Sequence, residues 1–338
     1  MHLLILGGTS FVGRHIVETA LAAGHRVTLF NRGTTDADLF AGRTTLVRGD
    51  RDVPGNVAQI ADVGADAVVD VSGYTPDTVR ASALAIRDSC ARYAFVSSID
   101  VFAYPNDAPD EDSPTKPLPD GAQTTTQDLE LYGAHKARCE RDLVELLGPD
   151  RVFVARYGFA VGPDDATDRF TYWPARVARG GEVLAPCDHR MRVQLIDARD
   201  AAAFVVSALE RELAGTYDVV GDPRKLTIGD VLYAALDATG SDARFTWVSE
   251  PFLLAQDVGA WVELPLWCPD VPEARDFRNV SNAKARRTGL VLRPLAETVR
   301  DVLADLRARP ASRTLRAGLT SENEARLLAT WRRNPSGS

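Results

Sequence analysis

Residues 2–13 read HLLILGGTSFVG, and this stretch decides the fold class of the chain. A short apolar run ends in Gly7 and Gly8, and apolar residues at helical spacing follow from Phe11 to Gly24. A buried strand, a glycine turn and a helix in this order begin a βαβ unit. Glycines let the backbone turn tightly, and the free N–H groups at the start of the helix favour a phosphate group.

The alternation of strand and helix continues through the first half of the chain. Apolar runs, each closed by a polar or glycine turn, lie at residues 26–32, 44–50, 66–73, 93–98 and 151–157. Helical patterns lie between them, at residues 75–91 and 129–147. Runs that are apolar on both faces indicate a parallel sheet covered by helices on both sides. We therefore predict an α/β fold with a Rossmann doubly wound parallel sheet.

The regular alternation of strand and helix ends after about Gly162. This change predicts a smaller C-terminal substrate lobe that is interwoven with the first domain. Helices rich in tryptophan and proline follow short strands there. We expect residues 1–165 to form an NAD(P)-binding Rossmann domain, with returning elements near 190–225 and 278–290. Residues 166–338 should form mainly the substrate-binding lobe.

The glycine loop predicts a dinucleotide site. Gly7, Gly8 and Gly13 fill the outer positions of the phosphate-binding fingerprint, and Ser10 stands where the middle glycine is usual. We expect the cofactor to be contacted by Gly7, Thr9, Ser10, Phe11, Val12 and Gly13.

The end of the second strand bears on the choice between NAD and NADP. The sequence there is LFNRG, with Asn31 and Arg32 in place of the carboxylate that binds the ribose of NAD. An arginine at this position can pair with a 2′-phosphate, which favours NADP as the cofactor over NAD. The alternative is that Arg32 is simply solvated.

A tyrosine and a lysine lie four residues apart in LELYGAHKARCE, residues 129–140. Positions i and i+4 share one helix face, so Lys136 can lie close to Tyr132 and lower the pKa of the phenol. That arrangement turns a weak acid into a usable proton donor and acceptor. Taken alone, the pair is equally compatible with two ordinary surface residues.

With the glycine loop, FVSSIDVF and YGAHK in one chain, the sequence resembles the extended short-chain dehydrogenase/reductase family, the NAD(P)-dependent epimerase/dehydratase group. The resemblance covers nearly the whole chain and includes ARYGFAVGP at residues 155–163 and the C-terminal pattern at residues 279–303. It implies that Ser98, Tyr132 and Lys136 are catalytic. It also implies cofactor contacts for Asp50, Arg51, Ser72, Gly73, Tyr132 and Lys136.

The resemblance implies a hydride transfer between a substrate carbon and a nicotinamide, with Tyr132 moving the proton and Lys136 and Ser98 assisting. The expected activity is that of an oxidoreductase or epimerase on a hydroxyl or carbonyl of a small polar metabolite, such as a sugar or nucleotide sugar. The residues do not separate reduction from epimerisation. Members of the family commonly form homodimers, and we expect a homodimer here. This expectation rests on the resemblance, since no residue of the sequence demonstrates a dimer.

The sequence departs from family patterns at several positions. Ile99 and Asp100 follow Ser98 in place of the Asp-Glu pair of sugar-nucleotide dehydratases, which disfavours dehydration; Asp100 is either a turn residue or faces the substrate. Val193 stands where nucleotide-sugar epimerases have an arginine, and Arg190 or Arg192 could substitute.

Two further segments allow two interpretations each. The composition of residues 104–128 predicts a loop. This loop is either mobile and above the active site, or it simply runs over the protein surface. Phe170, Tyr172, Trp173 and Arg176 form either core or one wall of a substrate pocket.

Composition limits the classes of function. The 338 residues carry a formal net charge of −8, which makes a nucleic acid an unlikely main partner. No apolar run is long enough for a membrane span, and neither the four cysteines nor the five histidines show metal-ligand spacing, so we expect a cytoplasmic protein with no metal. The competing hypothesis is a non-catalytic nucleotide-binding or RNA-associated protein of the same superfamily.

Overall fold

The computed structural model describes residues 1–103, 108–124, 128–269, 278–310 and 313–333, and the chain divides into two units. Unit 1 comprises Met1–Ala160, Ala198–Gly221 and Asn279–Leu292. Unit 2 comprises Val161–Asp197, Asp222–Arg278 and Arg293–Ser338. The chain therefore returns to unit 1 twice after leaving it.

Unit 1 is built on a seven-stranded sheet in the order β11-β6-β5-β4-β1-β2-β3, in which every pair of neighbours is parallel. Its strands are β1 (His2–Leu6), β2 (Arg26–Asn31), β3 (Thr45–Arg48), β4 (Ala67–Asp70), β5 (Arg92–Ser98), β6 (Val152–Tyr157) and β11 (Gly215–Val219). The strand order reverses between β1 and β4, which is the switch point where doubly wound sheets bind ligands. The predicted Rossmann sheet is confirmed.

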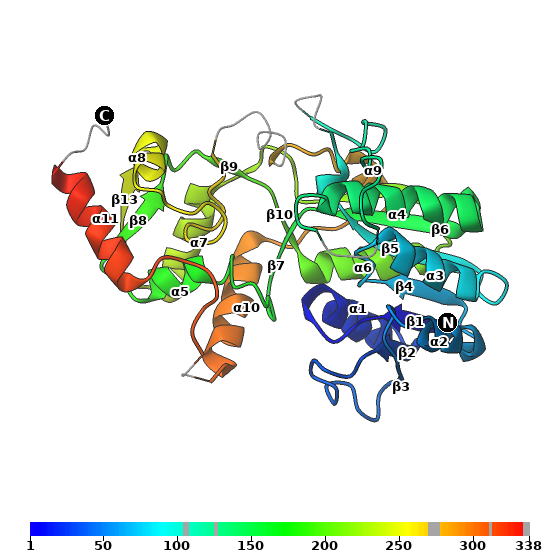
Figure 1. The fold of residues 1–338 in the computed structure, drawn as a ribbon. Helices are drawn as coiled ribbons and strands as arrows, with labels where there is room; N and C mark the ends of the chain where they lie inside the picture. Colours follow the sequence, from blue (N-terminus) through cyan, green and yellow to red (C-terminus); the bar gives the residue numbers. More distant parts are fainter. Residues whose placement is uncertain (104–107, 125–127, 270–277, 311–312, 334–338) are drawn as a thin grey trace. The chain divides into compact units, whose positions relative to one another are not determined.

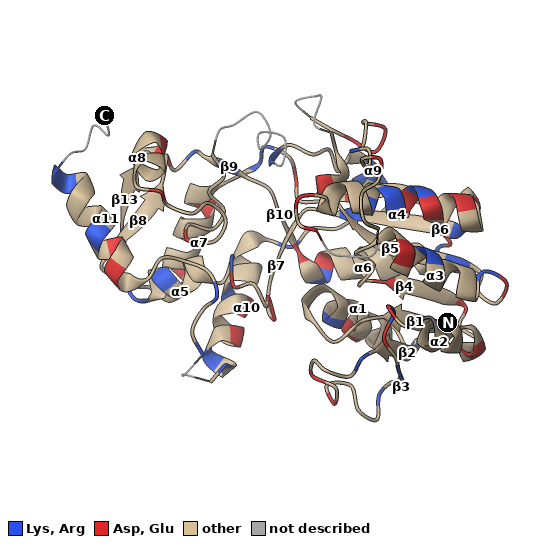
Figure 2. Cartoon of the chain, viewed as in Figure 1, with Lys and Arg blue, Asp and Glu red and all other residues tan. Residues whose placement is uncertain are grey.

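Helices cover both faces of this sheet (Figure 1). On one face α1 (Phe11–Ala22) packs beside α6 (Ala198–Glu210), and on the other α3 (Pro76–Ile86) packs beside α4 (Tyr132–Leu147). The shorter elements of unit 1 are α2 (Pro54–Val57), η1 (Ala58–Val63), η2 (Ile99–Val101), η3 (Pro149–Arg151) and α9 (Ala283–Arg287). Charges of both signs are interspersed along α3 and α4 in Figure 2, so these helices present no single basic face.

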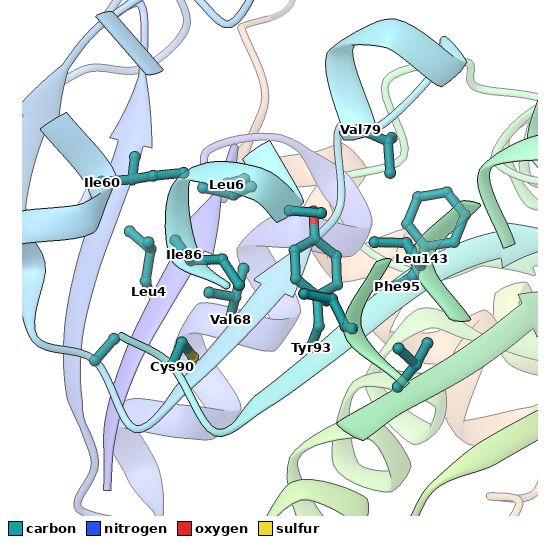
Figure 3. Packing of buried hydrophobic residues seen from close by; sticks show 14 of the residues in the cluster. Leu4, Leu6, Ile60, Val68, Val79, Ile86, Cys90, Tyr93, Phe95 and Leu143 are labelled. Atoms are coloured by element: carbon teal, nitrogen blue, oxygen red, sulfur yellow. The ribbon is translucent and has the colours of Figure 1, made fainter. Parts of the chain in front are cut away.

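The core under α3 and α4 explains why the strands are apolar on both faces. Leu4, Leu6 and Val68 from the sheet lie beside Ile60 and Ile86, as Figure 3 shows. The rings of Tyr93 and Phe95 fill the space toward α4 and are fully buried. Side chains alternate across a strand, so the remaining residues of β1 face α1 and leave no solvent-exposed side.

Unit 2 combines helices with short sheets. Its elements are α5 (Tyr172–Ala178), β8 (Glu182–Pro186), β9 (Arg192–Val193), β10 (Leu195–Asp197), β12 (Leu226–Thr227), α7 (Ile228–Thr239), β13 (Arg244–Val248), α8 (Glu250–Ala255), α10 (Leu295–Ala308) and α11 (Ser321–Arg333), and β7 (Phe159–Val161) lies where the chain enters the unit. Strand β13 pairs with β8, and β12 pairs with β9.

The aromatic segment that begins unit 2 belongs to its core. Phe170, Tyr172 and Trp173 are at most 2% exposed, and the indole of Trp173 donates to the carbonyl oxygen of Pro265 at 2.8 Å. Arg176 is also buried and forms an ion pair of 2.6 Å with Glu324. Of the two interpretations of this segment, the structure supports core.

Within the described ranges, none of the helices is both long and apolar enough to cross a membrane. In the same part of the chain, no group of three or more histidine, cysteine, aspartate or glutamate residues could hold a metal ion. All four cysteines carry free thiols.

Candidate active site

The glycine loop joins β1 to α1 at the switch point of the sheet. Gly7 and Gly8 have φ of +105° and +96°, which side chains with a Cβ rarely adopt. A Cβ on Gly13 would lie 2.9 Å from Val71 and 3.0 Å from the Cα of Gly8, so the helix starts in close contact with the loop. Ser10, the N-cap residue of α1, makes no side-chain capping hydrogen bond. The positive end of the helix dipole is thus left for a ligand anion.

A cavity of about 610 Å³ lies above this loop, entirely within unit 1. The predicted cofactor contacts that line it are Gly7, Thr9, Ser10, Phe11, Val12, Gly13, Asn31, Arg32, Asp50, Arg51 and Ser72. Gly73, Ser98, Tyr132 and Lys136 are not among the lining residues. Gly73 is buried, and a Cβ there would lie 2.6 Å from Val79 and 2.8 Å from both Asp70 and Phe95.

Asn31 ties the end of β2 to the glycine loop. Its amide nitrogen donates to the carbonyl oxygen of Gly7 at 3.0 Å, and its amide oxygen accepts from the N–H of Gly33 at 2.9 Å. Arg32 is exposed and lines the cavity. A Cβ on Gly33 would lie 3.1 Å from Nε of Arg48, so a second guanidinium packs against the same turn.

Sequence reasoning missed Arg48, although a signal for it exists. Asn31 of β2 is in register with Arg48 of β3, so the two strands end at the same edge of the sheet. The carboxyl ends of neighbouring parallel strands bring the residues that follow them together. The pairing of FNRG with LVRG therefore places two arginines at this edge.

Arg51 was expected to face the cofactor, but its guanidinium turns inward to Asp70. The two nitrogens Nη1 and Nη2 donate to the two carboxylate oxygens at 2.6 and 2.7 Å, and they also donate to the hydroxyls of Ser72 and Ser82. The hydroxyl of Tyr93 donates to Asp70 at 2.7 Å. This network fixes the floor of the cavity, and Arg51 lines the cavity with its cationic group already engaged.

The pKa of Asp70 follows from these partners. Burial alone would raise the pKa of this fully buried carboxyl, but the charge and hydrogen bonds of Arg51 and the hydroxyl of Tyr93 outweigh burial and lower it. Sequence reasoning did not single out Asp70. An aspartate inside an apolar strand is a usable signal, because a buried carboxylate needs a partner.

Ser98, Tyr132 and Lys136 come together at the carboxyl end of β5. Ser98 is the last residue of β5, and Tyr132 is the first residue of α4. The N–H of Asp100 donates to the hydroxyl of Ser98 at 3.1 Å, and Ser98 in turn hydrogen-bonds Tyr132. Lys136 is one helical turn further on and donates to the carbonyl oxygen of Val96 at 2.8 Å. The three residues implied by the resemblance are therefore neighbours.

Gly133 allows this approach. A Cβ at this position would overlap the carbonyl oxygen of Asp100 and lie 2.8 Å from its carboxylate. The first turn of α4 can therefore rest directly on the backbone of η2, which follows Ser98. Any larger residue would push Tyr132 away from Ser98.

The expected lowering of the Tyr132 pKa by Lys136 is not found. Burial, followed by the nearby phenol of Tyr74, raises the pKa of Tyr132 to about 12, although the hydrogen bond with Ser98 lowers it. The ammonium of Lys136 lies 5.9 Å from the ring centre of Tyr132 and is hydrogen-bonded to a backbone carbonyl instead. Burial lowers the pKa of Lys136 itself to about 8.

The segment that was expected to form a loop above the site is described only in part, since residues 104–107 and 125–127 lie outside the described ranges. Its described part is fastened to η2: Lys116 N–H donates to the carbonyl oxygen of Val101 at 2.7 Å, and Thr115 bridges Phe102. The ammonium of Lys116 forms an ion pair of 2.8 Å with Asp100. Asp100 thus pairs with a lysine that sequence reasoning had not singled out.

The two arginines considered for a substrate diphosphate both have protein partners. Arg190 is exposed and pairs with Asp188 at 2.9 Å. Arg192 donates to the carbonyl oxygen of Arg224 at 2.5 Å. Val193, at the position of the family arginine, is buried.

The fold and this arrangement define a Rossmann protein with a dinucleotide-type cavity at its switch point. Residues 3–220 match the NAD dependent epimerase/dehydratase family, and the chain belongs to that family. It is accordingly an enzyme of the extended short-chain dehydrogenase/reductase kind, as its sequence motifs predicted. No curated protein matches the sequence.

Solved structures of similar fold include two UDP-sugar 4-epimerases and the enzyme WbmH, each in complex with NAD. UDP-glucose 4-epimerase from Thermus thermophilus, in complex with NAD, has a TM-score of 0.66 at 19% identity, over 92% of this chain and 100% of that one. Bordetella bronchiseptica WbmH with NAD⁺ has a TM-score of 0.67 at 17% identity, over 91% and 98%. UDP-glucuronic acid 4-epimerase from Bacillus cereus with NAD has a TM-score of 0.64 at 15% identity, over 91% and 99%. At these identities the likeness shows the fold.

Proposed function

We propose that unit 1 binds a nicotinamide dinucleotide and that Ser98, Tyr132 and Lys136 assist hydride transfer at a hydroxyl or carbonyl of a small polar metabolite. The observation that carries this proposal is the contact of Tyr132 with Ser98, with Lys136 on the same helix face. We further propose that unit 2 is mainly the substrate-binding part of the chain.

The cavity fits a dinucleotide by its shape and its donors. The glycines at positions 7, 8 and 13 leave space that a Cβ would fill, and the N-terminus of α1 offers unpaired N–H groups to a pyrophosphate. The residues that would hold it are those of the glycine loop, Asp50 and Ser72. A bound nicotinamide supplies the hydride donor or acceptor.

A preference for NADP rests on the two arginines at the edge of β2 and β3. Arg32 and Arg48 flank Gly33, and residues 31–35 contain no carboxylate that would repel a 2′-phosphate. The name of the family and the solved structures in complex with NAD point to NAD instead. The two arginines are therefore the only support for NADP.

The hydrogen-bonding partners of Tyr132 suit it to proton transfer. The N–H of Asp100 donates to the hydroxyl of Ser98, and Ser98 is also a hydrogen-bonding partner of Tyr132. The raised pKa keeps the phenol of Tyr132 protonated near neutral pH, which suits proton donation to a carbonyl oxygen. Lys136, one turn further along α4, contributes positive charge beside the ring of Tyr132.

A sugar or nucleotide sugar is the proposed substrate class, because the solved relatives include UDP-sugar epimerases. Reduction and epimerisation begin with the same hydride transfer. They differ in whether changed cofactor is released, so cofactor absorbance during a screen of sugars and UDP-sugars separates the two.

Tyr132→Phe tests the function directly. It should lower turnover by well over tenfold, since general acid–base catalysis contributes roughly 10² to 10⁴. The dissociation constants of NADPH and NADH, measured by fluorescence titration, should stay nearly unchanged. Unaltered turnover rejects the role of Tyr132, and equal affinity for both cofactors in wild type and in Arg32→Ala rejects the preference for NADP.

We also propose a homodimer formed through α3 and α4. Leu84 on α3 is 50% exposed and Val144 on α4 is 40% exposed, and these helices pack side by side. Light scattering measures the oligomeric state of the wild type and of Leu84→Glu. A monomeric wild type contradicts the proposal.

A further inference from the structure

The ammonium of Lys136 lies among three aromatic rings. Its side chain is almost fully buried, and its one hydrogen bond goes to the carbonyl oxygen of Val96. In the described part of the chain it forms no ion pair. Three rings face its ammonium: Phe95 at 4.6 Å, Tyr74 at 5.2 Å and Tyr132 at 5.9 Å from their centres.

Such rings can keep a buried ammonium charged. Loss of water favours the neutral amine, and the negative faces of aromatic rings within about 6 Å favour the cation. The charged and titratable groups facing Lys136 are Asp70 and Arg51 beneath it and Cys139 and Glu140 on its own helix. Because Arg51 neutralises Asp70 and Arg156 neutralises Glu140, neither carboxylate is a free partner for the lysine.

The three rings differ in what else they do. Phe95 is part of the core, and Tyr132 is the proposed proton donor. Tyr74 has neither role, since it is 41% exposed, lines the cavity, and follows Gly73 in the turn after β4. The close packing of Gly73 against Val79 and Phe95 brings this turn down onto the sheet and sets the ring of Tyr74 beside Lys136.

We propose that Tyr74 is a positioning residue whose ring face, not its hydroxyl, holds the ammonium of Lys136 charged and in place. The inference rests on the proposed function only for its consequence in catalysis. The cage of Tyr74, Phe95 and Tyr132 is a property of the protein that can be measured without turnover.

The experiment compares Tyr74→Leu with Tyr74→Phe by NMR. The chain has only four lysines (Lys116, Lys136, Lys225, Lys284), so protein labelled with ¹³C-lysine gives few side-chain signals, and Lys136→Arg identifies the relevant one. Tyr74→Leu should lower the pKa of Lys136 by roughly one unit, the size of a desolvated cation–π contact. Tyr74→Phe should leave that pKa within a few tenths of wild type.

The outcomes are distinct. An unchanged pKa in Tyr74→Leu overturns the proposal, and an equal decrease in Tyr74→Phe overturns the assignment to the ring. The other three lysine signals report whether each variant is folded. Tyr233→Leu is the matched control: this tyrosine is 48% exposed on α7 of unit 2, and its loss should leave the signal of Lys136 unchanged.

A second readout links the cage to catalysis. With saturating cofactor, the alkaline limb of the turnover profile should move to lower pH in Tyr74→Leu by the same amount as the pKa of Lys136, and the limb of Tyr74→Phe should not move. Loss of turnover without a shift of the limb contradicts the positioning role. If Lys136→Met retains full turnover, the proposed function fails, and the NMR result still decides the cage.

Discussion

Two buried aspartates of one sheet behave in opposite ways. Asp70, at the end of β4, and Asp218, in β11, are both 0% exposed. Asp70 accepts hydrogen bonds from Arg51 and Tyr93, and its pKa is lowered. No described residue donates a hydrogen bond to either carboxylate oxygen of Asp218. The pKa of Asp218 is raised to about 8, by burial first and then by Glu111.

The pKa values of the two aspartates differ because the arginine nearest to Asp218 is already paired with another carboxylate. Asp218 is in register with Arg156 of β6, but the guanidinium of Arg156 is held by Glu140 at 2.8 to 3.2 Å. Glu111 lies close by, because its carboxylate accepts from the N–H of Asp218 at 3.0 Å. Proximity to a cation therefore does not stabilise a buried carboxylate when another carboxylate has already taken that cation.

Removing the cation beside Asp70 should have the largest effect. Arg51→Met leaves a buried carboxylate without its partner, and the free energy of unfolding should fall by about 3–5 kcal/mol. Urea unfolding followed by far-UV circular dichroism measures this change. The fluorescence of the five tryptophans follows unit 2, where all of them lie, and shows whether the two units unfold together.

Arg92→Met is the control for this prediction. Arg92 pairs with Glu212 on the surface of the same unit, at 2.8 Å and with the glutamate side chain 72% exposed. Such a pair contributes at most about 1 kcal/mol. Equal losses in both variants would mean that the burial of Asp70 does not matter.

Asp218→Asn should have a smaller effect of opposite sign. Because the folded chain keeps a proton on Asp218 that the unfolded chain releases, the stability of wild type should fall as pH rises from near 3.8 toward about 8 and then level off. The variant should lack this decline and exceed wild type at pH 8 by about 2 kcal/mol. Urea unfolding between pH 5 and 9 gives the slope, and identical slopes would contradict the raised pKa.

The sequence predicted most of unit 1 because its signals are local. A strand buried on both faces must be apolar throughout, and a helix that starts on a phosphate must follow a glycine turn. The family match and the fold confirm that interpretation. The residues implied for catalysis also lie together, since Ser98 ends β5 and Tyr132 begins α4.

The electrostatics of the site could not be predicted in the same way. The partner of Asp70 lies 19 positions away, and the partner of Asp100 lies 16 positions away on a segment without periodicity. The pKa of Tyr132 depends on its burial and on Tyr74, neither of which follows from the spacing of Tyr132 and Lys136. A sequence shows which residues share a helix face, but it does not show how much water reaches them.

Glu111→Gln should produce the smallest change and sharpen the comparison most. The amide oxygen can still accept from the N–H of Asp218, so the segment keeps its anchor while one negative charge beside the carboxyl of Asp218 disappears. The pKa of Asp218 should fall by roughly half a unit, which adds less than about 1 kcal/mol to stability above pH 8.

Asp112→Asn, in an exposed position of the same segment, removes an equal charge and should not move the titration of Asp218. Carboxyl NMR of ¹³C-aspartate separates the two variants. If Glu111→Gln leaves the titration in place, Glu111 makes no measurable contribution to the high pKa, and burial remains its largest cause. The contrast with Asp70 would then come from the partners of Asp70, because the charge and hydrogen bonds of Arg51 and the hydroxyl of Tyr93 together outweigh burial there.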